Sequence, residues 1–66
     1  MTTDKTMALA RKHLGKGDME SSARLCLADA VSLQEQGLLD YARKRALASL
    51  AYSVGVFHPD YIKASA

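Results

Sequence analysis

Apolar residues recur along this chain at the three- and four-residue spacing that places them on one face of an α-helix. Near the N-terminus this spacing defines one apolar stripe, which consists of Met7, Ala10 and Leu14. The stripe predicts a helix over residues 4–14. Thr3 is placed to cap its first turn, and Gly15 supplies a residue at which the helix can stop.

A second apolar seam follows the short glycine-containing loop GKGD. Its members are spaced 4, 3, 4 and 3 residues apart, and they are Met19, Ala23, Cys26, Ala30 and Leu33. Leu27 and Val31 thicken the seam. The pattern predicts a helix over residues 19–36, with Asp18 as its N-terminal cap and Gly37 as its end.

The third periodic segment carries two apolar stripes rather than one. The first stripe, which we expect to face the core, contains Leu39, Ala46, Leu50 and Val54, with Leu47 beside it. The second stripe contains Tyr41, Ala48 and Tyr52, with Arg45 between the two rings. Together they predict a helix over residues 39–54. Pro59 and Asp60 then suit the first turn of a short helical segment over residues 59–64.

These elements predict an all-α protein, since proline and β-branched residues are scarce and alanine and leucine dominate. Helices joined by short loops pack as antiparallel neighbours. We therefore expect one helical domain over residues 1–66. Its architecture would be a small three-helix bundle or an antiparallel helical hairpin array, with a short C-terminal helical turn.

The stretch from Ala46 to Phe57 contains no charged residue. A helix on the surface of a bundle keeps one polar face, but only Ser49 and Ser53 interrupt this stretch. The sequence therefore predicts that something covers the helix on its remaining side. The cover is either the C-terminal tail or another chain.

Composition and charge narrow the possible partners. The chain is 48% apolar and 24% charged, and nine cations against seven anions give a net charge of +2. That charge is too small to indicate a polyanion by itself. The single cysteine fits a reducing compartment, and the polar N-terminus has no signal-peptide pattern. The longest uncharged run, twelve residues, is too short to span a membrane. We therefore expect a cytoplasmic protein with no membrane partner.

Arg43, Lys44 and Arg45 form the densest run of cations. Adjacent helical residues point about 100° apart, so these three side chains fan over a wide arc. The interpretation that we favour is a solvated collar, with Asp40 paired to Lys44 one helical turn away. The alternative is a small nucleic-acid-binding regulator that contacts phosphates through this collar, although nucleic acid is not the partner that we expect.

No set of residues resembles a catalytic centre. No predicted cleft contains a Ser/His/Asp set, a phosphate-binding glycine loop or paired carboxylates. His13 is interpreted as a cation at a helix end, and His58 as a cap before Pro59. Cys26 is interpreted as an inert thiol on the apolar seam. We therefore expect no enzyme activity, metal, cofactor or small-molecule substrate.

Residues 23–59 resemble a helical hairpin of the tetratricopeptide repeat family. The resemblance rests on small residues around the turn between two helices, namely Ala30, Gly37 and Ala42. The chain differs from the family's pattern at Cys26, where the family has an aromatic residue. The resemblance implies paired helices that cross closely and a role as a protein–protein adaptor.

The predicted function is protein–protein interaction, as an adaptor or regulatory subunit that binds through its third helix. The residues that we expect at the contact are Tyr41, Arg45, Leu47, Ala48, Tyr52 and Phe57. Tyrosine and arginine are enriched at interface centres, although the two tyrosines could equally form the rim of the protein's own core. Self-association as a two-fold homodimer is the simplest form of this contact.

Overall fold

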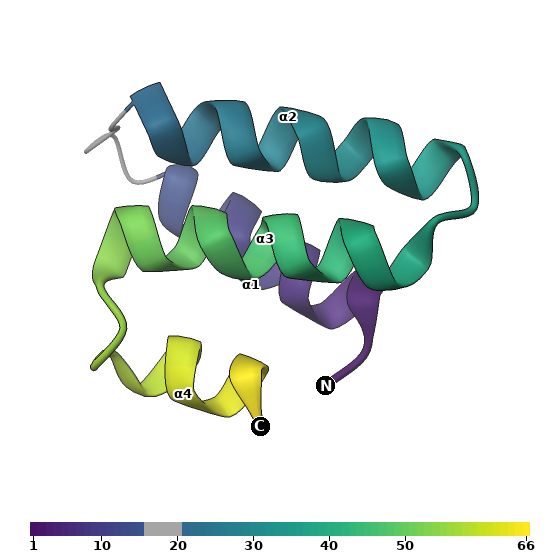
Figure 1. Ribbon diagram of the computed structural model, residues 1–66. Coiled ribbons are helices and arrows are strands. Elements are labelled where there is room, and N and C mark those ends of the chain that lie inside the picture. The colour runs from purple at the N-terminus through teal and green to yellow at the C-terminus, as the bar shows by residue number, and fades with distance from the viewer. Residues whose placement is uncertain (16–20) are drawn as a thin grey trace.

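The computed structural model describes residues 1–15 and 21–66, which fold into four α-helices (Figure 1). Their bounds are Thr3–Leu14 for α1, Ser21–Glu35 for α2, Leu39–Val54 for α3 and Pro59–Ser65 for α4. The described residues contain no β-strand. The expected all-α fold class, with its short C-terminal helix, is confirmed. Within the same residues, no helix combines the length and the apolar character needed to cross a membrane.

α3 is the central helix of the bundle. α2 and α1 pack along it, and α4 folds back against it (Figure 1). The turn between α2 and α3 contains Gly37, whose φ of +81° lies in the left-handed region that favours glycine. This conformation lets the chain reverse within a few residues, so α2 and α3 lie side by side and antiparallel.

The core consists of two adjoining groups of buried residues. The first core cluster contains Met7, Ala30 and Ala46, with Leu27 and Val31 packed against them. The buried residues of the second core cluster are Ala10, Leu50 and Ala64, and the partly buried residues around them are Met1, Leu9, Leu27, Leu47, Val54 and Tyr61. Most of the fully buried residues are alanines, so the helices pack through close approach of their backbones rather than through large side chains.

Ser49 shows how closely α2 and α3 approach each other. Ser49 and Ala23 are both fully buried. The Ser49 hydroxyl donates a hydrogen bond of 2.8 Å to the carbonyl oxygen of Ala23, so the buried hydroxyl has a partner, as buried polar groups require. A serine that interrupts the uncharged stretch in the sequence therefore links two helices and does not face solvent.

α4 covers one side of the uncharged stretch, while Tyr52 and Phe57 of that stretch stay exposed. Ala64 is fully buried beside Leu50 in the second core cluster, and Tyr61 packs against the same cluster. His58 caps the first turn of α4, because its Nδ1 atom accepts a hydrogen bond of 3.0 Å from the Asp60 amide. The C-terminal tail of the same chain therefore covers this side of α3.

The structure corrects the expectations for two residues near helix starts. Thr2, rather than Thr3, caps α1, because the Thr2 hydroxyl accepts a hydrogen bond of 3.3 Å from the amide of Lys5. Leu39 does not belong to the core, because it begins α3 with 52% of its surface exposed. The cap and first residue expected for the second helix, residues 18 and 19, lie outside the described residues.

Candidate functional site

The outer face of α3 carries the two tyrosines of the second apolar stripe. Tyr41, Arg45 and Tyr52 are spaced so that they share one side of the helix. Tyr41 is 60% exposed and Tyr52 is 53% exposed, and Ala48 is half-buried between them. Both rings are more than half exposed and therefore lie on the surface, and neither tyrosine is among the residues that pack against the two core clusters.

Arg45 does not stack between the two tyrosine rings. Its Nε atom donates to Asp29 Oδ2 of α2 at 3.0 Å. Lys44 takes the ring contact instead, with Nζ at 5.6 Å from the centre of the Tyr41 ring, and it does not form the expected ion pair with Asp40. The Arg45 and Asp29 side chains are 55% and 49% exposed, so their ion pair contributes less than about 1 kcal/mol to folding.

The three adjacent cations of α3 make different contacts. Arg43 turns into the molecule, where Nε donates to the carbonyl of Met1 at 3.2 Å and Nη2 donates to the carbonyl of Ala64 at 3.0 Å. Lys44 and Arg45 stay on the outer face. The basic collar is therefore divided between the interior and the surface, as the fan of adjacent helical positions predicts.

Two shallow hollows lie between α2 and α3 on the outer face. The first is lined by Leu25, Cys26, Asp29 and Arg45. The second is lined by Asp29, Leu33, Tyr41, Lys44 and Arg45. Because the hollows share Asp29 and Arg45, we treat them as one surface and call it the α2–α3 groove.

The residues of α2 that line the groove were not among those expected at the contact; they are Cys26, Asp29, Leu33 and the exposed Leu25. Leu25 is 71% exposed, and it lies beside Cys26, which is half-buried and also lines the groove. The usable signal in the sequence is a large apolar residue just off the apolar seam of the second helix. Such a residue must face away from the core, because the seam already defines the buried side.

Leu47 and Phe57 do not line the α2–α3 groove. Leu47 is half-buried and packs against the second core cluster, and its expected place at the contact stays a prediction. Its direction follows from the helical period, which turns it about 100° from its neighbour Ala48. Phe57 lies in the turn between α3 and α4 and is 90% exposed.

A second group of polar residues joins the end of α1 to the start of α4. His13 Nε2 lies 2.7 Å from Asp60 Oδ2. The rings of His13 and His58 pack edge to face, with centroids 5.2 Å apart and planes at 75°. One possible ligand atom from each of the three side chains lies within 4.8 Å of the others. The His13 side chain is only 9% exposed and that of Asp60 is 27% exposed, while His58 is half-buried.

The contact with His13 sets the charge state of Asp60. The hydrogen bond from His13 holds the pKa of Asp60 below its ordinary value of 3.8; partial desolvation opposes this shift, and the nearby charge of Lys12 adds to it. The carboxylate is therefore ionised at neutral pH, and His13 Nε2 must be the donor. Sequence reasoning kept these residues apart because His13 and Asp60 are 47 positions apart, and only the packing of α4 against α1 joins them.

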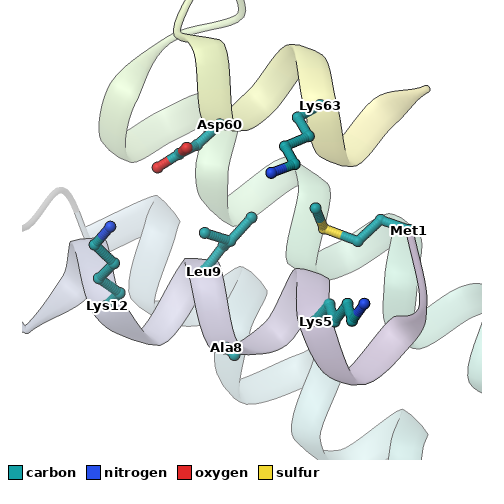
Figure 2. Close-up of a pocket in the computed structure, with 7 residues that line it drawn as sticks. All are labelled: Met1, Lys5, Ala8, Leu9, Lys12, Asp60 and Lys63. Carbon is teal, nitrogen blue, oxygen red and sulfur yellow. The ribbon is translucent and has the colours of Figure 1, made fainter.

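A pocket between α1 and α4 adjoins this group (Figure 2). Its lining residues are Met1, Lys5, Ala8, Leu9, Lys12, Asp60 and Lys63. In Figure 2, the apolar side chains of Met1 and Leu9 lie between the two helices, while Lys12 points toward the side of Asp60. The surroundings of the Asp60 carboxylate are therefore positively charged on the pocket side.

No protein-family model, curated protein or solved structure matches the chain significantly. The resemblance to tetratricopeptide repeats stays a prediction. The molecule has two candidate functional surfaces, the α2–α3 groove and the group formed by His13, His58 and Asp60.

Proposed function

We propose that the protein is a small helical interaction module that binds protein through the α2–α3 groove, and that its partner is a second copy of the same chain. The observation that carries the proposal is a set of exposed large apolar side chains at and beside this groove: Leu25, Tyr41 and Tyr52. Association would remove these side chains from water, and the hydrophobic effect favours that removal.

The groove carries charges of both signs, so the groove of one copy can be complementary to the groove of a second copy. Asp29 and Arg45 line both hollows and are about half exposed. In a two-fold contact centred on this pair, Arg45 of one copy faces Asp29 of the other, and the same contact repeats by symmetry. Such an arrangement gives the apolar contact a defined orientation.

The size of the molecule sets the expected strength of this association. The protein exposes 4125 Å² of accessible surface. A specific interface buries about 800 Å² per partner, or about one fifth of this surface. Because the groove is shallow and partly polar, we expect a dissociation constant of roughly 1–100 μM.

The pairing of α2 with α3 supports the same proposal. In repeat proteins one helical hairpin cannot bury its apolar face alone and needs a neighbouring hairpin. If the tetratricopeptide resemblance over residues 23–59 is correct, a second copy supplies that neighbour. A cytoplasmic location remains part of the proposal, because the single cysteine, Cys26, cannot form an internal disulfide.

Nucleic-acid binding through the basic collar is the alternative function, and the contacts of the collar argue against it. Arg43 is engaged with the carbonyls of Met1 and Ala64, and Arg45 is paired with an anion. A phosphate-binding surface needs several cations that face one way. We therefore expect no binding to a random DNA duplex at low salt. Binding that weakens steeply as salt is added would favour the alternative.

Replacing Leu25 with lysine tests the proposed self-association. The wild-type protein should sediment mainly as a dimer at a concentration of several hundred micromolar, given the expected dissociation constant of roughly 1–100 μM. The Leu25→Lys variant should associate at least about tenfold more weakly, because two lysines would be buried at the contact. Leu25 is 71% exposed, so helix content by circular dichroism should not change.

The matched control is Ile62→Lys. Ile62 is 54% exposed on α4, which packs against α1 and α3, so it lies outside the groove. This variant should keep the dimer of the wild-type protein in sedimentation equilibrium. A wild-type protein that stays monomeric at these concentrations, or an equal loss of dimer in both variants, would contradict the proposal.

A further inference from the structure

We infer that His13, His58 and Asp60 form a binding site for one divalent transition-metal ion, with Zn²⁺ as the ion to test first. The site lies between the last turn of α1 and the first turn of α4. It is separate from the α2–α3 groove, since none of its residues lines that groove. Its test is therefore independent of the self-association test.

The three side chains supply the donors that zinc prefers. Two imidazole nitrogens and one carboxylate oxygen occupy three positions of a tetrahedral zinc ion and leave the fourth for water. The same donors also suit Co²⁺ and Ni²⁺, whereas Mg²⁺ and Ca²⁺ prefer oxygen donors alone. The chemical class of the ligand is thus a divalent cation that accepts mixed nitrogen and oxygen donors.

One ion can reach all three donors after small movements. Bonds of about 2.1 Å place the donors of a tetrahedral ion about 3.4 Å apart. His13 Nε2 and Asp60 Oδ2, now 2.7 Å apart, would separate slightly. The His58 ring nitrogen, which lies within 4.8 Å of the ligand atoms of the other two residues, would move inward. Ala10 of α1 and Ala64 of α4 lie in the same core cluster. The packing of the two helices therefore already holds the donors near one another.

Zinc would replace two hydrogen bonds of the metal-free protein. When zinc binds His13 Nε2, the proton on that nitrogen moves to Nδ1 if the ring is neutral, or to solvent if the ring is charged. His58 Nδ1 accepts the Asp60 amide at 3.0 Å. Either ring nitrogen of His58 can bind the ion only if this hydrogen bond breaks, because a neutral imidazole has one lone-pair nitrogen. The Asp60 amide therefore reports on metal binding.

Positive charges beside the site limit its affinity. Lys12 and Lys63 line the pocket that also contains Asp60 (Figure 2). Their ammonium groups repel a bound dication, so we expect affinity in the micromolar range. Removal of one such charge in Lys12→Gln should tighten zinc binding several-fold.

Calorimetric titration of the tag-free 66-residue protein with ZnCl₂ tests the site. We expect one ion per chain, and we expect Co²⁺ to give the visible absorption of a tetrahedral complex. His58→Asn and Asp60→Asn should each weaken zinc binding at least about tenfold, which is the scale of losses seen when metal-site residues are changed. Asparagine at position 58 keeps a side-chain acceptor for the first turn of α4, so the variant retains a cap for that helix.

Cys26→Ser is the control, because a thiolate is another strong ligand for zinc. This variant should bind zinc as the wild-type protein does. In the wild-type protein, nuclear magnetic resonance should show zinc-induced shifts at the rings of His13 and His58 and at the Asp60 amide, a result that needs no variant to fold. Absence of wild-type binding, loss of binding in Cys26→Ser, or full binding in His58→Asn would overturn the inference and leave these residues as a hydrogen-bonded pair with a neighbouring cap.

Discussion

At the scale of single residues, Asp60 connects α1 and α4 through its carboxylate. Oδ2 lies 2.7 Å from His13 Nε2, and this hydrogen bond holds the pKa of Asp60 below 3.8 in the folded protein. A carboxyl group with a lowered pKa in the folded state stabilises that state at pH values above its unfolded pKa. The stabilisation is lost as the pH falls through the lowered folded pKa.

The Asp60→Asn variant should show what this carboxylate contributes in the metal-free protein. At neutral pH the wild-type protein should be more stable than the variant, and the difference should shrink as the pH falls below about 4. Urea unfolding midpoints in the presence of a chelator measure this difference. The control is Asp40→Asn, which removes an exposed carboxylate from the first turn of α3. A difference between wild type and Asp60→Asn that does not change with pH would contradict the assignment.

At the scale of elements, α4 shields part of the surface of α3 from solvent. The second core cluster contains Leu50 of α3 and Ala64 of α4, both fully buried. An alanine at this contact lets the backbone of α4 approach the surface of α3 closely. Protein interiors are packed as tightly as organic crystals, so we expect a larger side chain at this fully buried position to be overpacked.

Ala64→Leu should therefore weaken the packing of α4. We expect a loss of about 1–3 kcal/mol in the free energy of unfolding, the usual cost of overpacking a core. Chemical denaturation followed by circular dichroism measures it. Ala66→Leu makes the same change two residues later at an exposed position, and it should alter stability by less than about 0.5 kcal/mol. Equal effects of the two variants would show that Ala64 does not lie in a tight contact.

At the scale of the whole molecule, Arg43 links the middle of the chain to both of its ends. Its guanidinium donates to the carbonyls of Met1 and Ala64, at 3.2 and 3.0 Å. The Ala64 carbonyl lies in the last turn of α4, where carbonyl groups have no partner within the helix. A residue of the central helix thus supplies a hydrogen bond that the terminal helix cannot make for itself.

Replacing Arg43 with methionine removes both hydrogen bonds while keeping an aliphatic side chain. The free energy of unfolding should fall by about 1–3 kcal/mol, the range for hydrogen bonds to a charged group. Amide hydrogen exchange should also show faster exchange in α4, because α4 loses its hydrogen bond to Arg43 of α3. Lys44→Met, at the exposed neighbouring position, should leave exchange in α4 unchanged. Similar exchange rates in α4 of the two variants would contradict the prediction that Arg43 stabilises α4 through its hydrogen bond to the Ala64 carbonyl.

What the sequence alone determined is local. The three- and four-residue spacing of apolar residues is a property of consecutive turns, so it was enough to predict the all-α fold class. The same argument placed Tyr41, Arg45 and Tyr52 on one side of α3, because residues about one turn apart share a face. It also indicated that the uncharged stretch needed a cover.

Only the tertiary structure decided which residues meet across elements. Arg45 pairs with Asp29 rather than with the tyrosine rings, because antiparallel packing brings α2 beside α3. His13 meets Asp60 across 47 positions of sequence, because α4 folds back against α3 and also contacts α1. These contacts depend on distances between helices, and no local pattern of apolar and polar residues specifies those distances. The physical reason is that periodicity defines the face of each helix but leaves open which neighbour covers it.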